Sequence, residues 1–325
     1  MPANLRSSAL HRSTRTLPLL LLAAALAAAG CSVGGASPAS PAVPPAVSPT
    51  VSPAVPPADP GSASIDHPLG RGDLVIRVEL VGGFISPLAL VTRYPIVSIY
   101  GDGTAIAEGP VPMIYPGPAL PNLQAANVGE AGLQRLLGLA AADGLLGPDA
   151  SYNGMGVADA ATTAFTVVAN GVRHRITAYA LSEAANDTGL DAATAAARVK
   201  LRAFATAVTD LRGTLGSSAV GGDTPYVYTG VALYIAPGAP ASGDPTLVQT
   251  PIAWPLATSL ATFGKPAVGS LGPTRCGVVT GSDLDTLRPL LARASQLTGW
   301  SSAGATYTIT PRVLLPDETR CPGAA

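Results

Sequence analysis

Charged side chains are scarce in this sequence. They make up 12% of its 325 residues, the formal net charge is -1, and lysine occurs only as Lys200 and Lys265. A protein that binds nucleic acid or another polyanion needs clustered Lys and Arg to neutralise it. The composition therefore excludes that class of protein, and we expect no nucleic-acid partner.

Histidine is also rare. Three are present, and only His67 and His174 lie beyond the N-terminal segment. We expect His67 to be solvated and His174 to be a structural residue within a strand. No Gly-x-Ser-x-Gly elbow, Ser-x-x-Lys motif, phosphate-binding loop or His-Glu-x-x-His motif occurs. The sequence thus offers no catalytic residue, cofactor site or metal site.

Cysteine is limited to Cys31, Cys276 and Cys321. The last two make an even pair, which predicts a disulfide in an oxidising compartment. Bridged, they close a loop of 45 residues, which the chain-entropy model values at roughly 4 kcal/mol. Two reduced, buried thiols are the alternative. A metal site is disfavoured because no His or third Cys lies near enough in sequence to complete a tetrahedral set.

The N-terminus has the three parts of a signal peptide. Basic residues up to Arg15 precede an apolar run over residues 17–29, and small residues then precede Cys31. The run is too short to span a bilayer comfortably, which favours a cleaved signal peptide over residues 1–30. The order Ala-Ala-Gly-Cys resembles the lipobox of bacterial lipoproteins, which implies cleavage before Cys31 and its acylation. An ordinary signal peptide with an incidental Cys31 is the alternative.

Residues 31–66 contain repeated Ser-Pro, Val-Pro and Ala-Pro units with almost no charge. Such a segment cannot bury a core, so we expect a disordered linker. Several acyl chains on Cys31 would anchor the protein stably. The sequence therefore predicts an extracytoplasmic protein that is tethered to a bacterial membrane through acylated Cys31.

Two turn dipeptides organise residues 67–212 into a first module. Asp-Gly at 102–103 and Asn-Gly at 170–171 each separate alternating apolar stretches, which predicts two hairpins. In the first hairpin we expect Ile99 to pair with Ile106. The predicted pairs of the second hairpin are Ala169 with Val172, Val167 with His174 and Phe165 with Ile176.

Two helices complete this module. Asn127 with Glu130 predicts the N-cap and capping box of a helix that ends at Gly144. Apolar residues at helical spacing predict a second, amphipathic helix over residues 192–211. Together with a strand over residues 74–82, these elements are typical of an α+β fold.

Residues 213–224 are rich in Gly and Ser and predict a linker to a second module, residues 225–325. This module is expected to contain a strand from Tyr226, a helix that opens at Ser282 and a final strand that leads to Cys321. We therefore expect an α+β protein with two modules, each an antiparallel sheet with helices packed on one face.

The first module also resembles a known group of proteins. The hairpin "IYGDGT", the helix ending "AAADGLL" and the stretch "VADAATTAFTVVANGVRHRITAYAL" resemble uncharacterised domains in secreted lipoproteins of GC-rich bacteria. The resemblance covers residues 70–212. It implies a location and an architecture, and no catalytic residue comes with it.

Three tyrosines form the candidate ligand face. Tyr226, Tyr228 and Tyr234 share a parity on the expected strand, and aliphatic residues occupy the opposite parity. If exposed, the tyrosines would stack on sugar rings or on a partner protein. The alternative is that they pack beneath the Pro-rich stretch near Trp254.

The expected function is a non-catalytic binding or accessory module for cell-wall polymer, another envelope protein or a small ligand. A hydrolase that uses a carboxylate pair is one alternative, and it predicts a cleft with two acidic side chains within about 10 Å. The candidates, chosen only because they are acidic, are Asp149, Asp159, Glu183, Asp317 and Glu318. We expect the last two in a solvated turn. An inhibitor or assembly factor for another exported protein is the third hypothesis.

Overall fold

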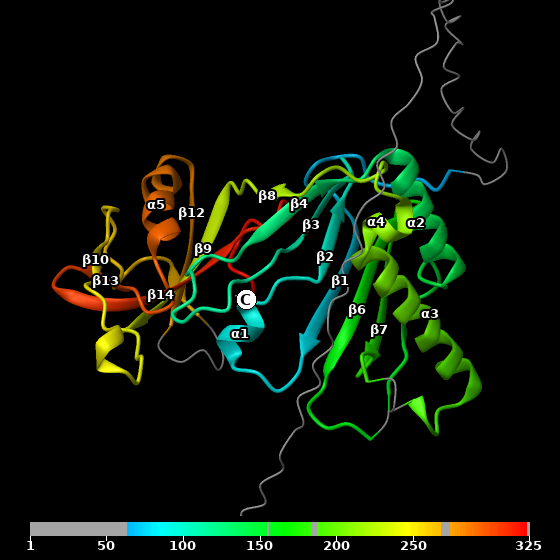
Figure 1. The fold of residues 1–325 in the computed structure, drawn as a ribbon, viewed down its shortest axis with the longest axis horizontal. Helices are drawn as coiled ribbons and strands as arrows, with labels where there is room; N and C mark the ends of the chain where they lie inside the picture. The colour runs from blue at the N-terminus through cyan, green and yellow to red at the C-terminus, as the bar shows by residue number, and fades with distance from the viewer. Residues whose placement is uncertain (1–63, 155, 184–186, 268–273, 324–325) are drawn as a thin grey trace, which may run out of the picture. The chain divides into compact units, whose positions relative to one another are not determined.

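The computed structural model describes residues 64–154, 156–183, 187–267 and 274–323. The predicted signal peptide, most of the predicted linker and Cys31 lie outside these residues. Two antiparallel-rich sheets with accompanying helices form the described part (Figure 1). The expected α+β class is confirmed. No helix in the described ranges is both long and apolar enough to cross a membrane.

The first sheet has eight strands in the order β5-β7-β6-β1-β2-β3-β4-β8. Its strands are β1 (Leu74–Gly82), β2 (Val97–Tyr100), β3 (Thr104–Glu108), β4 (Leu123–Asn127), β5 (Ala150–Ser151), β6 (Ala161–Ala169), β7 (Val172–Tyr179) and β8 (Thr224–Pro225). Strand pairs are antiparallel except β5 with β7. The long central strands, β1 and β6, are therefore paired on both sides.

Helices α2 (Glu130–Ala142) and α3 (Ala192–Thr209), with the short α4 (Leu211–Leu215), lie along one side of this sheet (Figure 1). Each long helix buries an apolar stripe against the sheet. The buried residues of the stripes are Leu133, Leu136 and Leu137 in α2, and Leu201, Phe204 and Val208 in α3. They form one core with Ile76 of β1 and Phe165 of β6. The expected packing of helices on one sheet face is thus observed.

The second predicted hairpin is confirmed in register, because Phe165 pairs with Ile176 and the remaining pairs follow. The register of the first hairpin was predicted wrongly. Ile99 pairs with Ala105, and Ser98 pairs with Ile106. The loop of this hairpin has three residues, 101–103, rather than two. One extra loop residue shifts the pairing by one position.

The start of α2 also differs from the prediction. Gly129 is the N-cap, whereas Asn127 is the last residue of β4 and pairs with Thr104. Asn127 is therefore part of a strand pair and does not cap the helix. At the other end, Gly144 follows the helix at φ 85°, which is the predicted C-terminal signal.

The second sheet has six strands in the order β10-β13-β14-β9-β12-β11. Its strands are β9 (Gly230–Pro237), β10 (Ile252–Ala253), β11 (Lys265–Pro266), β12 (Arg275–Thr280), β13 (Gly299–Ser302) and β14 (Ala305–Val313). Helix α5 (Gly281–Arg293) packs on it through Leu284, Leu287 and Leu291. The described residues also include two short helical segments, α1 (Pro87–Thr92) and η2 (Pro245–Leu247).

The strand expected from Tyr226 begins only at Gly230. Thr224 and Pro225 pair with β4 of the first sheet, whereas β9 belongs to the second sheet. Residues 226–229 therefore cross from one sheet to the other. The stretch predicted as a linker also contacts the first sheet, since Val220 bridges to Val128 and is 5% exposed.

The sheets also share an apolar cluster, on the opposite face of the first sheet from α2 and α3. Leu74, Tyr100 and Leu123 of the first sheet pack with Val313 at the end of β14 and with Leu315 just after it. Both sheets belong to one compact unit, Gly61–Ala325. The C-terminal segment, residues 314–323, follows β14 and thus lies where the two sheets meet.

Candidate functional site

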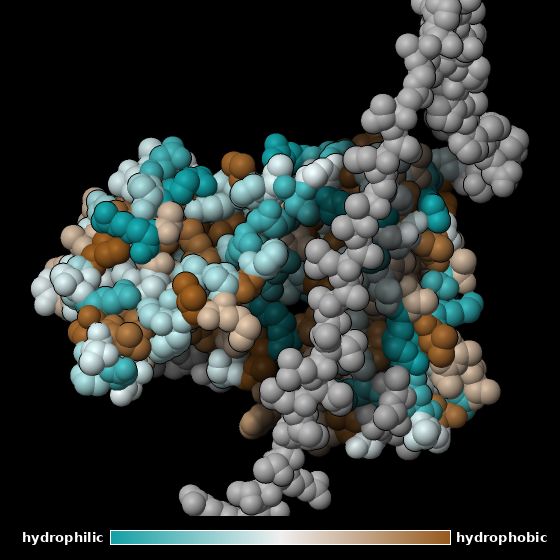
Figure 2. All heavy atoms as spheres, viewed as in Figure 1, coloured by the Kyte–Doolittle hydropathy of each residue, from teal (hydrophilic) through white to brown (hydrophobic). Residues whose placement is uncertain are grey.

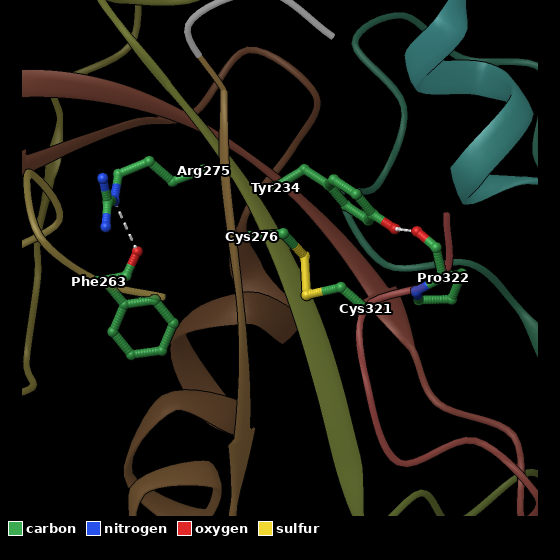
Figure 3. Close-up of a disulfide and its surroundings, with 6 residues drawn as sticks. All are labelled: Tyr234, Phe263, Arg275, Cys276, Cys321 and Pro322. Carbon is green, nitrogen blue, oxygen red and sulfur yellow. Dashed lines mark hydrogen bonds between the residues drawn. A yellow bond between two sulfur atoms is a disulfide. The ribbon is translucent and has the colours of Figure 1, made fainter. Parts of the chain in front are cut away.

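A disulfide joins Cys276 of β12 to Cys321 near the C-terminus, with a Cα–Cα distance of 6.3 Å. The predicted pair is therefore bonded, and both residues are buried. The bridge lies beside Tyr234 of β9, whose hydroxyl donates to the carbonyl of Pro322 (Figure 3). Leu88 and Val91 of α1 pack on the same cluster. The bridge ties the C-terminal segment to the second sheet.

The three tyrosines of the candidate ligand face have different partners within the chain. Tyr234 is 2% exposed. Tyr226 is partly buried and donates to the carbonyl of Leu314 over 3.2 Å. Tyr228 lies under the guanidinium of Arg288, 4.2 Å from its ring centroid. Only Tyr234 lies on β9, so the expected parity does not relate it to the other two.

Burial affects the acidity of all three hydroxyls. It raises the pKa of Tyr226 and of Tyr234 to about 12 each, and it also raises the pKa of Tyr228, which Arg288 opposes. The three phenols are therefore neutral at physiological pH. The buried hydroxyl of Tyr228 has no hydrogen-bond partner.

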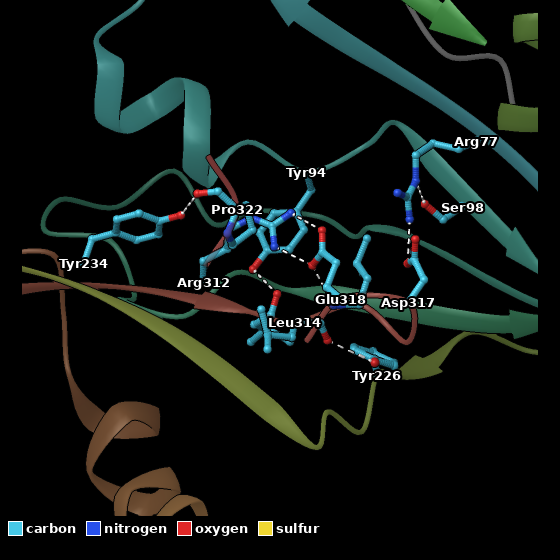
Figure 4. Close-up of polar contacts among 12 residues, drawn as sticks. Arg77, Tyr94, Ser98, Tyr226, Tyr234, Arg312, Leu314, Asp317, Glu318 and Pro322 are labelled. Carbon is cyan, nitrogen blue, oxygen red and sulfur yellow. Dashed lines mark hydrogen bonds and ion pairs between the residues drawn. The ribbon is translucent and has the colours of Figure 1, made fainter. Parts of the chain in front are cut away.

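Arg312 of β14 is the centre of a polar cluster beside the C-terminal segment (Figure 4). Its Nη1 and Nη2 donate to the two carboxylate oxygens of Glu318 over 2.6 and 2.9 Å. The guanidinium lies 4.7 Å from the ring centroid of Tyr94. Arg312 is 3% exposed, yet its Nε has no hydrogen-bond partner. An unpaired buried donor costs about 1–3 kcal/mol, and this atom is too deeply buried to meet the solvent.

Arg77 of β1 makes a second set of polar contacts to the same segment. Its Nε donates to Ser98 Oγ over 3.0 Å, and its Nη2 donates to Asp317 Oδ1 over 2.8 Å. The hydroxyl of Tyr100 donates to that same carboxylate oxygen over 2.8 Å. Figure 4 shows Asp317 and Glu318 turned to arginines of different strands. The expected solvated turn is wrong, because both acidic side chains are held in ion pairs.

These contacts set the charge of the cluster. Burial raises the pKa of Tyr94 and of Tyr100 well above the usual value, although Arg312 and Arg77 oppose the change. Burial lowers the pKa of Arg77, but the charge and hydrogen bond of Asp317 outweigh it and the net change is upward. The tyrosines therefore remain neutral and Arg77 remains charged at physiological pH.

A cleft of about 380 Å³ adjoins this cluster. It is lined by side chains from β1, α1 and the C-terminal segment. Its ionisable wall consists of Arg77, Arg93, Arg312, Glu79 and Glu318, and its apolar wall includes Leu80, Val81, Leu90, Val91, Tyr94 and Pro322. Small-molecule sites usually occupy about 300–1,000 Å³ and combine apolar walls with a few polar groups. The cleft meets both conditions.

Arg93 differs from the other arginines of the cleft. It follows α1 as its C-cap, and its Nη1 donates to the carbonyls of Leu80 and Gly82 over 3.2 and 3.1 Å. No carboxylate pairs with it among the described residues, whereas Arg77 and Arg312 each have one. The cleft wall therefore contains more cationic donors than its own carboxylates satisfy.

A second groove, of about 490 Å³, lies between β2, β3 and β4 and the α3–α4 corner. Its floor is apolar and includes Val97, Ala126 and Val208. Two charged groups at its rim are engaged with each other, since Arg212 pairs with Asp223 over 3.1 Å. Asp210, which also lines it, caps the start of α4 through the N–H of Gly213. These three side chains already serve the fold.

Exposed apolar side chains occur mainly in loops. Val111, Met113, Ile114 and Tyr115, between β3 and β4, are each at least 60% exposed. Figure 2 shows a face on which hydrophobic residues are interspersed with hydrophilic ones. Exposed apolar residues of this kind are common in soluble domains, so they identify no site by themselves.

Neither of the two described histidines, His67 and His174, lines the cleft. His67 was expected to be solvated, but it is 7% exposed. Its Nδ1 lies 2.7 Å from the carbonyl of Pro68 and its Nε2 3.2 Å from Glu130. His174 pairs with Val167 as predicted, and its Nδ1 lies 2.8 Å from the carbonyl of Gly147. The described part of the chain has no cluster of three His, Cys, Asp or Glu side chains that would hold a metal.

Sequence reasoning missed the three arginines of the cleft. Arg77 and Arg312 each occur within an apolar strand. An arginine isolated among apolar residues, as in "TPRVLLP", indicates a buried side chain that needs a charged partner. Their carboxylate partners are 240 and 6 positions away, respectively. The short separation of Arg312 and Glu318 was detectable, whereas the pairing of Arg77 with Asp317 depends on the tertiary fold.

Comparisons with known proteins add no assignment. A scan against protein-family models, a search of curated proteins and a search of solved structures each found no match to this chain.

Proposed function

We propose that this protein is a lipid-anchored, extracytoplasmic binding module, and that its ligand enters the cleft beside Arg93 and Arg312. The ligand is a cell-wall polymer, a segment of another envelope protein or a small molecule. The anchor is acylated Cys31, and the Pro-rich residues 31–66 act as a tether. Binding is non-catalytic in this proposal.

The cleft is the observation that supports binding. It has the volume of a ligand site, apolar walls and one guanidinium, that of Arg93, which pairs with no carboxylate in the described part of the chain. A partly exposed guanidinium without a carboxylate partner favours an anionic ligand, because charge-assisted hydrogen bonds are strong. The bonded pair of Cys276 and Cys321 further supports an oxidising, extracytoplasmic location.

A carboxylate-based hydrolase is the weaker proposal. Glu79 and Glu318 line the same cleft, as that hypothesis requires. Both oxygens of Glu318 already accept hydrogen bonds from Arg312, and one also accepts from the N–H of Leu315. Glu79 pairs with Arg175 over 3.4 Å. A general acid needs a carboxyl group that keeps its proton, and ion-paired carboxylates are poor candidates.

Binding is tested by co-sedimentation of the detergent-extracted full chain with purified cell-wall sacculi. Leu90→Trp would fill the mouth of the cleft, since Leu90 lines it and is 40% exposed. Leu69→Trp is the control, because Leu69 is 73% exposed and lies outside the cleft lining. We expect the wild-type chain and L69W to pellet and L90W to remain in solution. Equal pelleting of L90W would contradict the cleft as the site, and no pelleting of the wild-type chain would exclude a wall-polymer ligand.

The anchor is tested separately by Cys31→Ser. The lipobox proposal expects the wild-type chain in the membrane fraction and C31S in the soluble extracytoplasmic fraction, because the acyl chains provide the membrane affinity. Fractionation followed by immunoblotting measures this. Retention of C31S on membranes would show that another feature holds the protein there.

A further inference from the structure

We propose that the cleft binds an organic carboxylate with a short apolar body, and that the carboxylate group pairs with Arg93. This inference rests on the proposed function and specifies the chemistry of its ligand.

The carboxylates of the cleft wall are each paired with an arginine. Glu318 receives three hydrogen bonds, two from Arg312 and one from the N–H of Leu315. Glu79 receives one from Arg175. Asp317, which neighbours Glu318, receives hydrogen bonds from Arg77 and Tyr100. A cationic ligand would therefore have to compete with an arginine for each of these carboxylates.

Arg93 is the arginine of the wall that remains available to a ligand. Arg312 is engaged, because both of its terminal nitrogens are directed at Glu318 (Figure 4) and its Nε is buried out of reach of the solvent. Arg93 uses Nη1 for two backbone carbonyls and has no carboxylate partner in the described part of the chain. Charge-assisted bonds from guanidinium to carboxylate are strong and geometrically specific. An anionic acceptor is the ligand group that fits this guanidinium.

The remainder of the cleft specifies the body of the ligand. Leu80, Leu90 and Val91 line it beside the ring of Tyr94. These walls favour aliphatic carbon, because apolar surface gains free energy when it leaves water. The volume of about 380 Å³ limits the ligand to a small molecule or to the end of a chain. Two sources supply this chemistry, a free aliphatic acid and the carboxyl terminus of a peptide.

The test is isothermal titration of the detergent-extracted full chain with hexanoate and with N-acetyl-alanyl-alanine. The matched neutral probes are hexanamide and the amide of the same dipeptide. We expect each carboxylate to bind about tenfold or more tightly than its amide, as a charge-assisted bond implies. Tighter binding of hexanoate identifies a free acid as the source, and tighter binding of the dipeptide identifies a peptide end.

Variants locate the effect. Arg93→Gln removes the unpaired charge and should weaken carboxylate binding about tenfold. Arg93→Lys keeps the charge but loses the planar guanidinium, so its affinity should lie between those of the wild-type chain and R93Q. Arg135→Gln is the control, since Arg135 is exposed on α2 and lies outside the cleft. Circular dichroism checks that each variant is folded. The comparison of acid with amide on the wild-type chain does not depend on any variant.

The outcomes separate this inference from the proposed function. Equal binding of hexanoate and hexanamide, both lost in L90W, would overturn the carboxylate while leaving the cleft as a binding site. Carboxylate binding that R93Q leaves unchanged would also overturn it. Sacculus pelleting that L90W leaves unchanged contradicts the cleft as the site, whatever the probes show.

Discussion

At the scale of single residues, buried arginines do more for this fold than its composition suggests. Arg198 of α3 is fully buried and makes four hydrogen bonds. Three go to the carbonyls of Tyr152, Tyr179 and Ala180, each over 2.8 Å, and one goes to Asp187 over 2.5 Å. The residue thus joins the helix to the edge of the first sheet. Its place on the buried stripe of an amphipathic helix gave no reason to expect this.

Replacement of Arg198 should be severe. Arg198→Met preserves apolar bulk but leaves Asp187 with one arginine partner and removes one hydrogen bond from each of three carbonyls, so the free energy of unfolding should fall by about 3–5 kcal/mol. Urea denaturation followed by circular dichroism measures it. Arg202→Met is the matched control, because Arg202 contacts the same Asp187 from a side chain that is 27% exposed. It should cost about 1 kcal/mol or less, and equal losses would refute the importance of burial.

At the scale of elements, the two turn dipeptides differed in how well they predicted the register of their hairpins. The Asn-Gly turn was sufficient to predict every pair of the β6–β7 hairpin, because two-residue turns dictate their register. The Asp-Gly turn was not sufficient, because its loop includes Gly101. The N–H of Gly101 donates to the carbonyl of Asp73, the residue before β1, over 2.9 Å. No local sequence pattern predicts this contact.

The two turn glycines provide a test of this difference. Gly103 and Gly171 have φ values of 81° and 73°, which disfavour any side chain. A Cβ at Gly103 would also collide with the carbonyl oxygen of Val128, whereas a Cβ at Gly171 would meet nothing within 4 Å. Gly171→Ala should therefore cost about 1 kcal/mol of unfolding free energy, and Gly103→Ala should cost clearly more. Thermal denaturation compares them, and equal melting temperatures would contradict the collision.

At the scale of the whole molecule, the C-terminal segment is the part that both sheets share. Asp317 contacts Arg77 of β1, Glu318 contacts Arg312 of β14, and Cys321 is bonded to β12. The segment forms one wall of the cleft. Stability and binding are therefore coupled in this proposal, since the contacts that hold the segment also shape the site.

Removal of the disulfide should accordingly lower global stability. For a loop of 45 residues, Cys276→Ala with Cys321→Ala should reduce the free energy of unfolding by about 4 kcal/mol. Guanidinium denaturation measures this, and unfolding of the wild-type chain under reducing conditions is the control. A loss below about 1 kcal/mol would show that the packing around Tyr234 and Pro322 holds the segment without the bridge.

The sequence by itself determined the α+β class, the amphipathic helices, the second hairpin and the cysteine pair. The class, the helices and the hairpin follow from periodicity and turn chemistry, which act over a few neighbouring positions. The cysteine pair follows from the residue count, because a cysteine can bridge only to another cysteine. The cleft was decided by tertiary structure. Arg77 and Asp317 are 240 positions apart, and Tyr226, Tyr228 and Tyr234 have their partners on α5 and on the segment that follows β14. Contacts at such separations depend on how the sheets pack, and no local pattern specifies that packing.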